Sequence, residues 1–494
     1  MSEKKRNFIR TFSFIITPVI LLVILLFFPL DDHNPSVTRT FCIMTLMAVW
    51  WITGVVPLAV TSLLPVALFP LMGVLDGRDV ASAYFNDVIF LFMGGFLVAL
   101  AMQRWNLHRR IALHILAFTG VSPGRILLGF MLASAFLSMW ISNTATAMMM
   151  LPIAMSIIKQ LELLMTERST ARFSTGVLLG IAYSASIGGI ATLVGTPPNL
   201  SFIRIYHIYF PDSPEVSFSQ WMLFALPVAV LLLATAWGVL YVYFRPRKEE
   251  WIQIRRELII KQIHKLGKTT YEEKLVGIIF FLLALLWLLR ADLNLGTYTL
   301  KGWGSLFKNS SFLNDGTAAI AMAILLFIIP ARKEHHTPLL DWKTASSLPW
   351  DILLLFGGGF ALALGIKESG LSVWFGEQLL GVTSLHPLWI ILSVSLLITF
   401  LTELTSNTAT TEMVLPILAG ISISSGIDPL LLMIPATLSA SMAFMLPVAT
   451  PPNAIVFGSN RITMGQMART GLILNLAGAV IITLMMYFWG RVVF

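Results

Sequence analysis

Two stretches decide the fold: WISNTATAMMMLPI at residues 140–153 and LTSNTATTEMVLPI at residues 404–417. They share Ser-Asn-Thr-Ala-Thr and lie 264 residues apart (404 minus 140). DVIFLFMGGF at 87–96 recurs at the same offset as DILLLFGGGF at 351–360, and VGTPPN at 194–199 recurs as VATPPN at 448–453. Three matches in one order indicate a duplicated chain, with repeats over about 39–244 and 273–494.

The composition places both repeats in a membrane. Of 494 residues, 57% are hydrophobic and 12% are charged, whereas soluble domains carry about 25% charged residues. Cys42 is the single cysteine and no Cys/His cluster has zinc spacing, which excludes disulfide-built and zinc-built folds. We therefore predict an all-α polytopic membrane protein.

About 20 apolar residues are needed for a spanning helix. The first span lies in an N-terminal segment, 1–38, which resembles a signal peptide but lacks a small-residue cleavage site. Eleven spans are predicted: 11–30, 39–54, 56–73, 86–104, 176–194, 221–244, 273–290, 315–331, 350–367, 429–448 and 470–490.

Two apolar segments, 122–160 and 386–422, are too long for one helix and too short for two spans with a loop. Each has a polar tripeptide near its middle, Ser142-Asn143-Thr144 or Ser406-Asn407-Thr408. We interpret both as re-entrant hairpins, whose tips need cover from protein or a water-filled cavity.

The net charge of +8 predicts topology rather than nucleic-acid binding. Of the 33 Lys and Arg, 25 fall on alternating loops: 1–10, 104–125, 159–172, 245–274, 332–343 and 461–469. The basic loops and the N-terminus are expected in the cytoplasm and the C-terminus outside, in a plasma membrane such as the bacterial inner membrane. The linker 245–272, with Trp251, Ile252 and Ile254 between its cations, is expected as an amphipathic segment against membrane lipid.

Loop charge gives the hairpins opposite orientations, the first opening to the cytoplasm and the second to the outside. Inverted repeats are an arrangement of secondary transporters, with substrate and ion sites near the bilayer midplane. A channel could also present polar tips there, but hairpins that open to opposite sides favour alternating access. No H-E-x-x-H motif is present and the eight histidines fall mostly in loops or at their edges, so we do not expect an enzyme.

Paired prolines predict a broken helix in each repeat, at 176–208 and at 429–460. A break frees carbonyls on one half-helix, which suit Na⁺, and N–H groups on the other, which suit an anion. Neither motif contains Lys, Arg or His, so neutral donors and neighbouring Na⁺ would hold the anion. Sodium is the expected coupling ion, and no organic cofactor is expected.

The pattern resembles the divalent anion/sodium symporter family, which comprises dicarboxylate, citrate and sulfate carriers. Besides both Ser-Asn-Thr motifs, one stretch looks like that family's signature: Ala440-Ser441, Phe444, Pro447-Val448-Ala449, Asn453 and Ile455-Val456. The resemblance covers nearly the whole chain. It implies a homodimer in which hairpins and broken helices move, elevator-like, as a transport domain against a fixed scaffold.

The resemblance also implies site residues. One sodium site would use Ser138, Ser142, Asn143 and the backbone at Gly195; the second would use Thr402, Ser406, Asn407 and the backbone at Ala449. The anion would meet Asn143, Thr144, Asn407 and Thr408, with Thr196, Pro197, Thr450 and Pro451 below it.

Repeat symmetry fails at Glu403 and Glu412, where the first repeat has Met139 and Met148. We expect both glutamates to face the aqueous approach to the second hairpin; the alternative is an additional cation or proton site. The Gly-Gly-Phe motifs are expected to allow close helix approach or a kink.

The expected function is Na⁺-coupled symport of C4-dicarboxylates such as succinate, fumarate and malate. The alternatives are a sodium-independent dicarboxylate exchanger of the same fold and a sulfate or citrate symporter.

Overall fold

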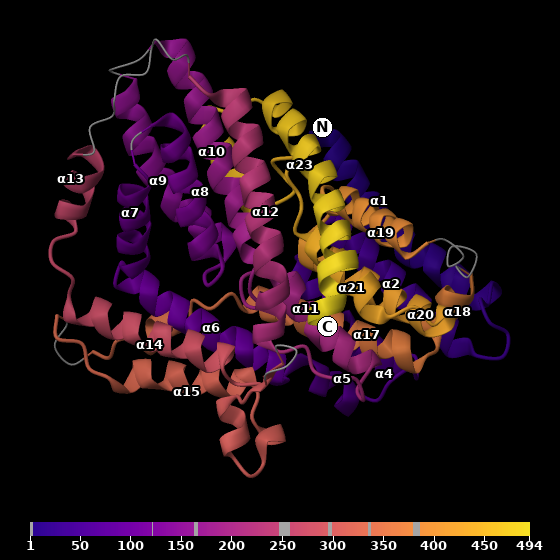
Figure 1. Cartoon of the computed structure of the whole chain (residues 1–494). Coiled ribbons are helices and arrows are strands. Elements are labelled where there is room, and N and C mark those ends of the chain that lie inside the picture. Colours follow the sequence, from indigo (N-terminus) through magenta and orange to yellow (C-terminus); the bar gives the residue numbers. More distant parts are fainter. Residues whose placement is uncertain are drawn as a thin grey trace.

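The fold is almost entirely helical (Figure 1). It is known from a computed structural model that describes residues 3–120, 122–162, 166–246, 257–294, 299–333, 337–378 and 386–494. Trp251, Ile252 and Ile254, on which the predicted amphipathic linker partly depends, lie outside these residues.

The first half runs from the N-terminus to the end of α12. Its helices are α1 (Glu3–Phe27), α2 (Pro35–Thr53), α3 (Leu58–Thr61), α4 (Leu64–Leu71), α5 (Gly77–Tyr84), α6 (Asp87–Arg104), α7 (Leu107–Thr119), α8 (Pro123–Ser138), α9 (Asn143–Leu161), α10 (Glu167–Gly189), α11 (Pro197–Tyr209) and α12 (Phe218–Phe244).

The second half follows the linker helix α13 (Glu257–Lys265). Its helices are α14 (Tyr271–Leu288), α15 (Asp315–Ile328), α16 (Trp342–Ala345), α17 (Trp350–Glu368), α18 (Leu371–Gln378), α19 (Pro387–Thr402), α20 (Asn407–Ser425), α21 (Pro429–Ala440), α22 (Pro451–Phe457), α23 (Met464–Met485) and α24 (Arg491–Val493). A π-helix, Met486–Gly490, joins the last two, and β1 (Leu293–Asn294) pairs antiparallel with β2 (Thr299–Leu300) in the loop before α15.

Six helical stretches among the described residues are long and apolar enough to cross a membrane. They are Pro35–Thr53, Gly77–Arg104, Asn143–Leu161, Phe218–Phe244, Trp350–Glu368 and Met464–Val493. Shorter apolar helices, among them α8, α15, α19 and α21, accompany them. The chain is a polytopic helical membrane protein, as the composition predicted.

Several predicted spans have the wrong bounds; the span 176–194, for example, is α10, Glu167–Gly189. The span 56–73 is two short helices, α3 and α4, because Pro65 near the start of α4 has no N–H to continue the helix from Thr61. The span 429–448 stops at Ala440, and the chain is non-helical from there to α22.

The helix ends repeat at the offset of the motifs. Both α8 and α9 have counterparts, α19 and α20, whose first and last residues each lie 264 positions later (387 minus 123; 407 minus 143). In Figure 1, α7–α10 lie on the left and α17–α21 on the right, with α12 and α23 between them. Helices α12 and α23 pack against each other. In addition, α12 packs against α10, and α23 packs against α19.

The helices that contain the Gly-Gly-Phe motifs, α6 and α17, pack the two halves against each other. A Cβ on Gly94 of α6 would lie 2.6 Å from Cβ of Ala319 in α15, and a Cβ on Gly358 of α17 would lie 2.3 Å from the carbonyl oxygen of Ser62. These glycines therefore allow close helix approach, as expected. Each half contributes one such helix to a contact with the other half.

Candidate functional site

The first hairpin tip is the turn between the end of α8 at Ser138 and the start of α9 at Asn143. Ser142 is the N-cap of α9, and its side chain accepts a hydrogen bond from the backbone N–H of Ala145 at 3.3 Å. The Ser138 hydroxyl, at the end of α8, donates to Oδ1 of Asn143 across the tip. Ser138 is buried, whereas Ser142, Asn143 and Thr144 are half-buried.

The first helix break lies directly beside this tip. The chain leaves α10 at Gly189 and enters α11 at Pro197, with the buried Thr196 as N-cap. The Asn199 side chain donates to the carbonyls of Thr192 at 2.7 Å and Gly189 at 3.2 Å, which fixes the loop. The Thr192 hydroxyl donates to the carbonyl of Met139 at 2.5 Å, so the break is held against the tip.

Four oxygens lie where tip and break meet, two beside Gly189 and two beside Gly195. A Cβ on Gly189 would lie 2.6 Å from Oδ1 of Asn143 and 3.1 Å from the carbonyl oxygen of Gly195. A Cβ on Gly195 would lie 2.5 Å from the carbonyl oxygen of Gly189 and 3.0 Å from that of Ser138. Neutral carbonyl and amide oxygens are suitable ligands for a hard cation. The sequence did not single out Gly189, although a glycine at the end of a broken helix could have indicated it.

The second tip, between α19 and α20, has the same construction. The Thr402 hydroxyl lies 2.7 Å from Oδ1 of Asn407 and 2.8 Å from the carbonyl oxygen of Ala440. Thr402 thus joins the tip to the end of α21. Ser406 is the N-cap of α20 and, like Asn407, is half-buried, whereas Thr408 is buried.

The second break also resembles the first. Asn453 donates to the carbonyls of Ala443 and Leu446, both at 3.0 Å, and Thr450 caps α22 by accepting from the N–H of Asn453 at 3.4 Å. Ala449 is buried beside this cap, whereas Pro451 is exposed.

Glu403 does not face water, so its predicted exposure was wrong. Its side chain is buried, with 4% exposed. Its carboxylate accepts from the N–H groups of Phe444 and Met445 at 2.7 Å and of Leu446 at 3.0 Å, and from the Asn475 amide at 2.8 Å. Glu403 therefore binds the N–H groups that the second break frees.

Glu412 is also buried, with no exposed surface, which again corrects the prediction. It lies on α20 between two other helices. Oε1 accepts from the Ser201 hydroxyl of α11 at 2.5 Å, and a Cβ on Gly359 of α17 would lie 2.2 Å from Oε2. Helix contact, rather than an aqueous approach, surrounds this carboxyl group.

The two tip-and-break units interlock. The half-helix α22 of the second break packs against α9 and α10, and α11 of the first break packs against α20 and α21. Each break therefore contacts the hairpin of the other half, and both motifs belong to one packed body. Among the described residues, no group of three or more His, Cys, Asp or Glu could hold a metal ion. A cation here would meet neutral oxygens.

Comparison with known proteins fits this arrangement. The sequence profile of the sodium:sulfate symporter transmembrane region matches residues 10–494. The chain belongs to this family. Membership confirms the resemblance that the motifs indicated.

Curated relatives in the family are similar over almost the whole chain. The sodium-dependent dicarboxylate transporter SdcS of Staphylococcus saprophyticus is 44% identical over 493 residues, which cover 98% of this chain and 92% of the relative. SdcS of Staphylococcus aureus is 45% identical over 495 residues, covering 99% and 93%.

Two solved transporters share the fold at low identity. The YdaH transporter of Alcanivorax borkumensis has a TM-score of 0.53 at 15% identity, covering 85% of this chain and 87% of that one. MtrF of Neisseria gonorrhoeae, described with a class of antimetabolite efflux pumps, has a TM-score of 0.56 at 12% identity, covering 92% and 94%.

Proposed function

We propose that the protein is a secondary active transporter that carries C4-dicarboxylate anions, namely succinate, fumarate and malate, together with Na⁺. The observation that carries the proposal is the pair of tip-and-break units, in which the residues assigned as ligands present neutral oxygens. The similarity to two sodium-dependent dicarboxylate transporters supports both the ion and the class of substrate. A carrier of this kind performs no covalent chemistry, so we propose no enzymatic activity.

The first unit is the proposed first sodium site. Its ligands are Ser138, Ser142, Asn143 and the backbone at Gly195, to which the geometry adds the carbonyl of Gly189. Two oxygens beside Gly189 and two beside Gly195 support this assignment. In the second unit, Thr402, Ser406, Asn407 and the backbone at Ala449 are the proposed ligands, supported by the hydrogen bond between Thr402 and Asn407.

The anion is proposed to lie between the two tips. Asn143 and Thr144 begin α9, and Asn407 and Thr408 begin α20, so the carboxylates would meet amide and hydroxyl donors at two helix N-termini. The floor of this anion site would be lined by Thr196, Pro197, Thr450 and Pro451. No Lys, Arg or His side chain is assigned to the anion. The sodium ions that travel with the anion would therefore balance its charge.

Alternating access follows from the proposed topology. We propose two inverted repeats, 39–244 and 273–494, with re-entrant hairpins at 122–160 and 386–422 that open to opposite sides. The N-terminus is placed in the cytoplasm and the C-terminus outside. The matching helix ends support the repeats, and the interlocked units support one moving transport domain, in a homodimer with elevator-type motion.

Liposomes containing the purified protein test the function. Labelled succinate should accumulate with an inward Na⁺ gradient and should not accumulate when K⁺ replaces Na⁺. Uptake in K⁺ that depends on internal dicarboxylate would contradict symport and indicate an exchanger. Uptake of sulfate or citrate, but not succinate, would retain sodium coupling and change the substrate.

A further inference from the structure

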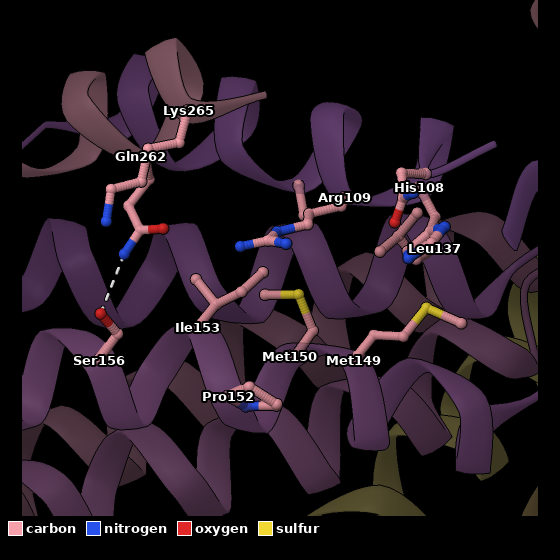
Figure 2. Close-up of a pocket in the computed structure, with 12 residues that line it drawn as sticks. His108, Arg109, Leu137, Met149, Met150, Pro152, Ile153, Ser156, Gln262 and Lys265 are labelled. Atoms are coloured by element: carbon pink, nitrogen blue, oxygen red, sulfur yellow. Dashed lines mark hydrogen bonds between the residues drawn. The ribbon is translucent and has the colours of Figure 1, made fainter. Parts of the chain in front are cut away.

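A cavity of about 470 Å³ lies between the first hairpin and the linker helix, apart from the proposed transport site (Figure 2). Helices α7 and α13 form one wall, and α9, with Leu137 of α8, forms the other. None of the residues assigned above to sodium or to the transported anion lines it. Cavities of roughly 300–1,000 Å³ are the usual size of small-molecule sites.

The first wall of this cavity is cationic. It carries Arg109 of α7 and Lys265 of α13, and Figure 2 shows Arg109 facing Met150 and Ile153 of α9. Among the described residues that line the cavity, none is Asp or Glu. Neither Arg109 nor Lys265 is in an ion pair with another described residue. Two positive charges without a counter-charge favour an anionic ligand.

The cationic wall is held by an ion pair to α14, whereas a neutral side-chain hydrogen bond joins it to α9. Arg110 of α7 forms an ion pair with Glu273 of α14 at 3.0 Å and donates to the carbonyl of Gly267, just after α13, at 3.1 Å. Across the cavity, the Gln262 side chain of α13 donates to the Ser156 hydroxyl of α9 at 2.9 Å (Figure 2). A neutral hydrogen bond of this kind adds only about 1 kcal/mol to the contact between the walls.

The counterpart of this helix pair, 264 residues later, is closed. Ser156 of α9 corresponds to Gly420 of α20, and Ala112 of α7 corresponds to Gly376 of α18. A Cβ on Gly420 would lie 2.1 Å from the carbonyl oxygen of Ser372, and one on Gly376 would lie 2.2 Å from Oγ of Ser424. The same pair of elements is therefore open in one half and closed in the other.

We propose that the cavity is a second anion site, which takes a small organic dianion of the transported class from the cytoplasmic side and slows the return of the carrier. The predicted effect on uptake rests on the proposed function, whereas the binding of the anion does not. In alternating access between inverted repeats, α9 must close on α7 as α20 opens from α18. An anion bound by Arg109 and Lys265 fills the space into which α9 would move, so high internal dicarboxylate would inhibit further uptake.

Thiol labelling tests the site without requiring transport. Cys42 is the only cysteine, so Cys42→Ser with Ser156→Cys places one thiol in the cavity, and Met148→Cys on α9, 54% exposed and outside the lining, is the matched control. Both are made with Asn143→Ala and Asn407→Ala to disable the proposed transport site. In phosphatidylcholine nanodiscs, saturating succinate should slow N-ethylmaleimide labelling at position 156 about tenfold and leave position 148 unchanged.

Adding Arg109→Gln with Lys265→Gln should abolish this protection. Protection that survives the loss of both cations would overturn the proposal, as would no protection at all. Protection by inorganic phosphate or by phosphatidylglycerol, but not by succinate, would also overturn it, because the ligand would then be a phosphate or a lipid headgroup.

Preloaded liposomes test the consequence. Internal succinate should slow Na⁺-driven uptake through the otherwise native protein, and Arg109→Gln with Lys265→Gln should relieve this inhibition without changing the external KM. Equal inhibition in both proteins would overturn the regulatory role. Absence of Na⁺-driven uptake altogether would instead contradict the proposed function, and the labelling result would still decide whether the cavity binds the dianion.

Discussion

Four asparagines organise the candidate site at the level of single residues. Asn143 and Asn407 accept from a hydroxyl one turn upstream of each tip, and Asn199 and Asn453 donate to the carbonyls of each break. The sequence predicted all four to lie at the tips and breaks, because the duplicated motifs contain them. It could not predict the partners of Glu403, because these N–H groups lie 41 to 43 positions further along the chain.

Gly189→Ala should weaken sodium binding at the first site. The new methyl group would lie 2.6 Å from Oδ1 of Asn143 and 3.1 Å from the carbonyl oxygen of Gly195, two oxygens of the proposed site. We expect the Na⁺ concentration for half-maximal succinate uptake to rise about tenfold or more, equivalent to about 1.4 kcal/mol of binding free energy. Gly238→Ala, with nothing within 4 Å of its Cβ, is the control. Equal Na⁺ dependence in both variants would argue against a cation at this position.

Glu403→Gln should destabilise the second break. A carboxylate accepts the three backbone N–H groups with its two oxygens, whereas an amide presents one oxygen and an NH₂ group that cannot accept. At least one buried donor would lose its partner, at a cost of about 1–3 kcal/mol. Thermal unfolding of the purified protein measures this effect, with Glu377→Gln on the exposed surface of α18 as control. A Glu403→Gln protein as stable as the control would show that these hydrogen bonds contribute little.

Gly359→Ala should impair folding or transport, and Glu412→Ala should rescue it. The added Cβ would lie 2.2 Å from the Glu412 carboxylate in a packed interface, and overpacking of this kind costs about 1–3 kcal/mol. Shortening Glu412 removes the clashing atoms. Gly277→Ala, whose Cβ would have ordinary contacts, gives the baseline. Melting temperatures of the single and double variants test the pair, and additive losses would contradict a direct clash.

Elements were predicted best where local sequence signals end them. The hairpin segments 122–160 and 386–422 correspond to α8–α9 and α19–α20, with outer ends that differ by one to three residues. At the first tip, Ser142 caps α9 and so starts that helix locally. The early end of α21 was missed because it depends on a distant partner. Its N–H groups after Ala440 pair with Glu403 instead of continuing the helix.

Close packing of α6 on α15 should be sensitive to side-chain volume. Gly94→Val would place three carbons against the Ala319 backbone, where even a Cβ lies at 2.7 Å. We expect the free energy of unfolding to fall by about 1–3 kcal/mol, as in other overpacked cores. Gly465→Ala, with open space at its Cβ, should unfold at the native temperature. Unfolding of Gly94→Val at the native temperature as well would show that the helices separate easily.

The whole molecule is asymmetric although its halves are duplicated. The α7–α9 pair encloses a cavity, and the α18–α20 pair is closed. The family and the polytopic helical fold could be predicted because each depends on patterns within a segment. Which of two equivalent helix pairs is open depends on contacts across the molecule, so no local pattern indicated the cavity.

The net charge that crosses the membrane in one transport cycle depends on how many sodium ions accompany the dianion. Moving a dianion inward against 100 mV costs about 4.6 kcal/mol, and each entering Na⁺ offsets about 2.3 kcal/mol. Two oxygen-lined sodium sites would therefore make transport electroneutral.

Simultaneous uptake of labelled sodium and labelled succinate into liposomes tests the central claim most directly. The account predicts about two sodium ions per succinate, with both fluxes lost in Asn143→Ala and in Asn407→Ala. Succinate uptake that brings no sodium with it, or that survives both substitutions, would contradict the account.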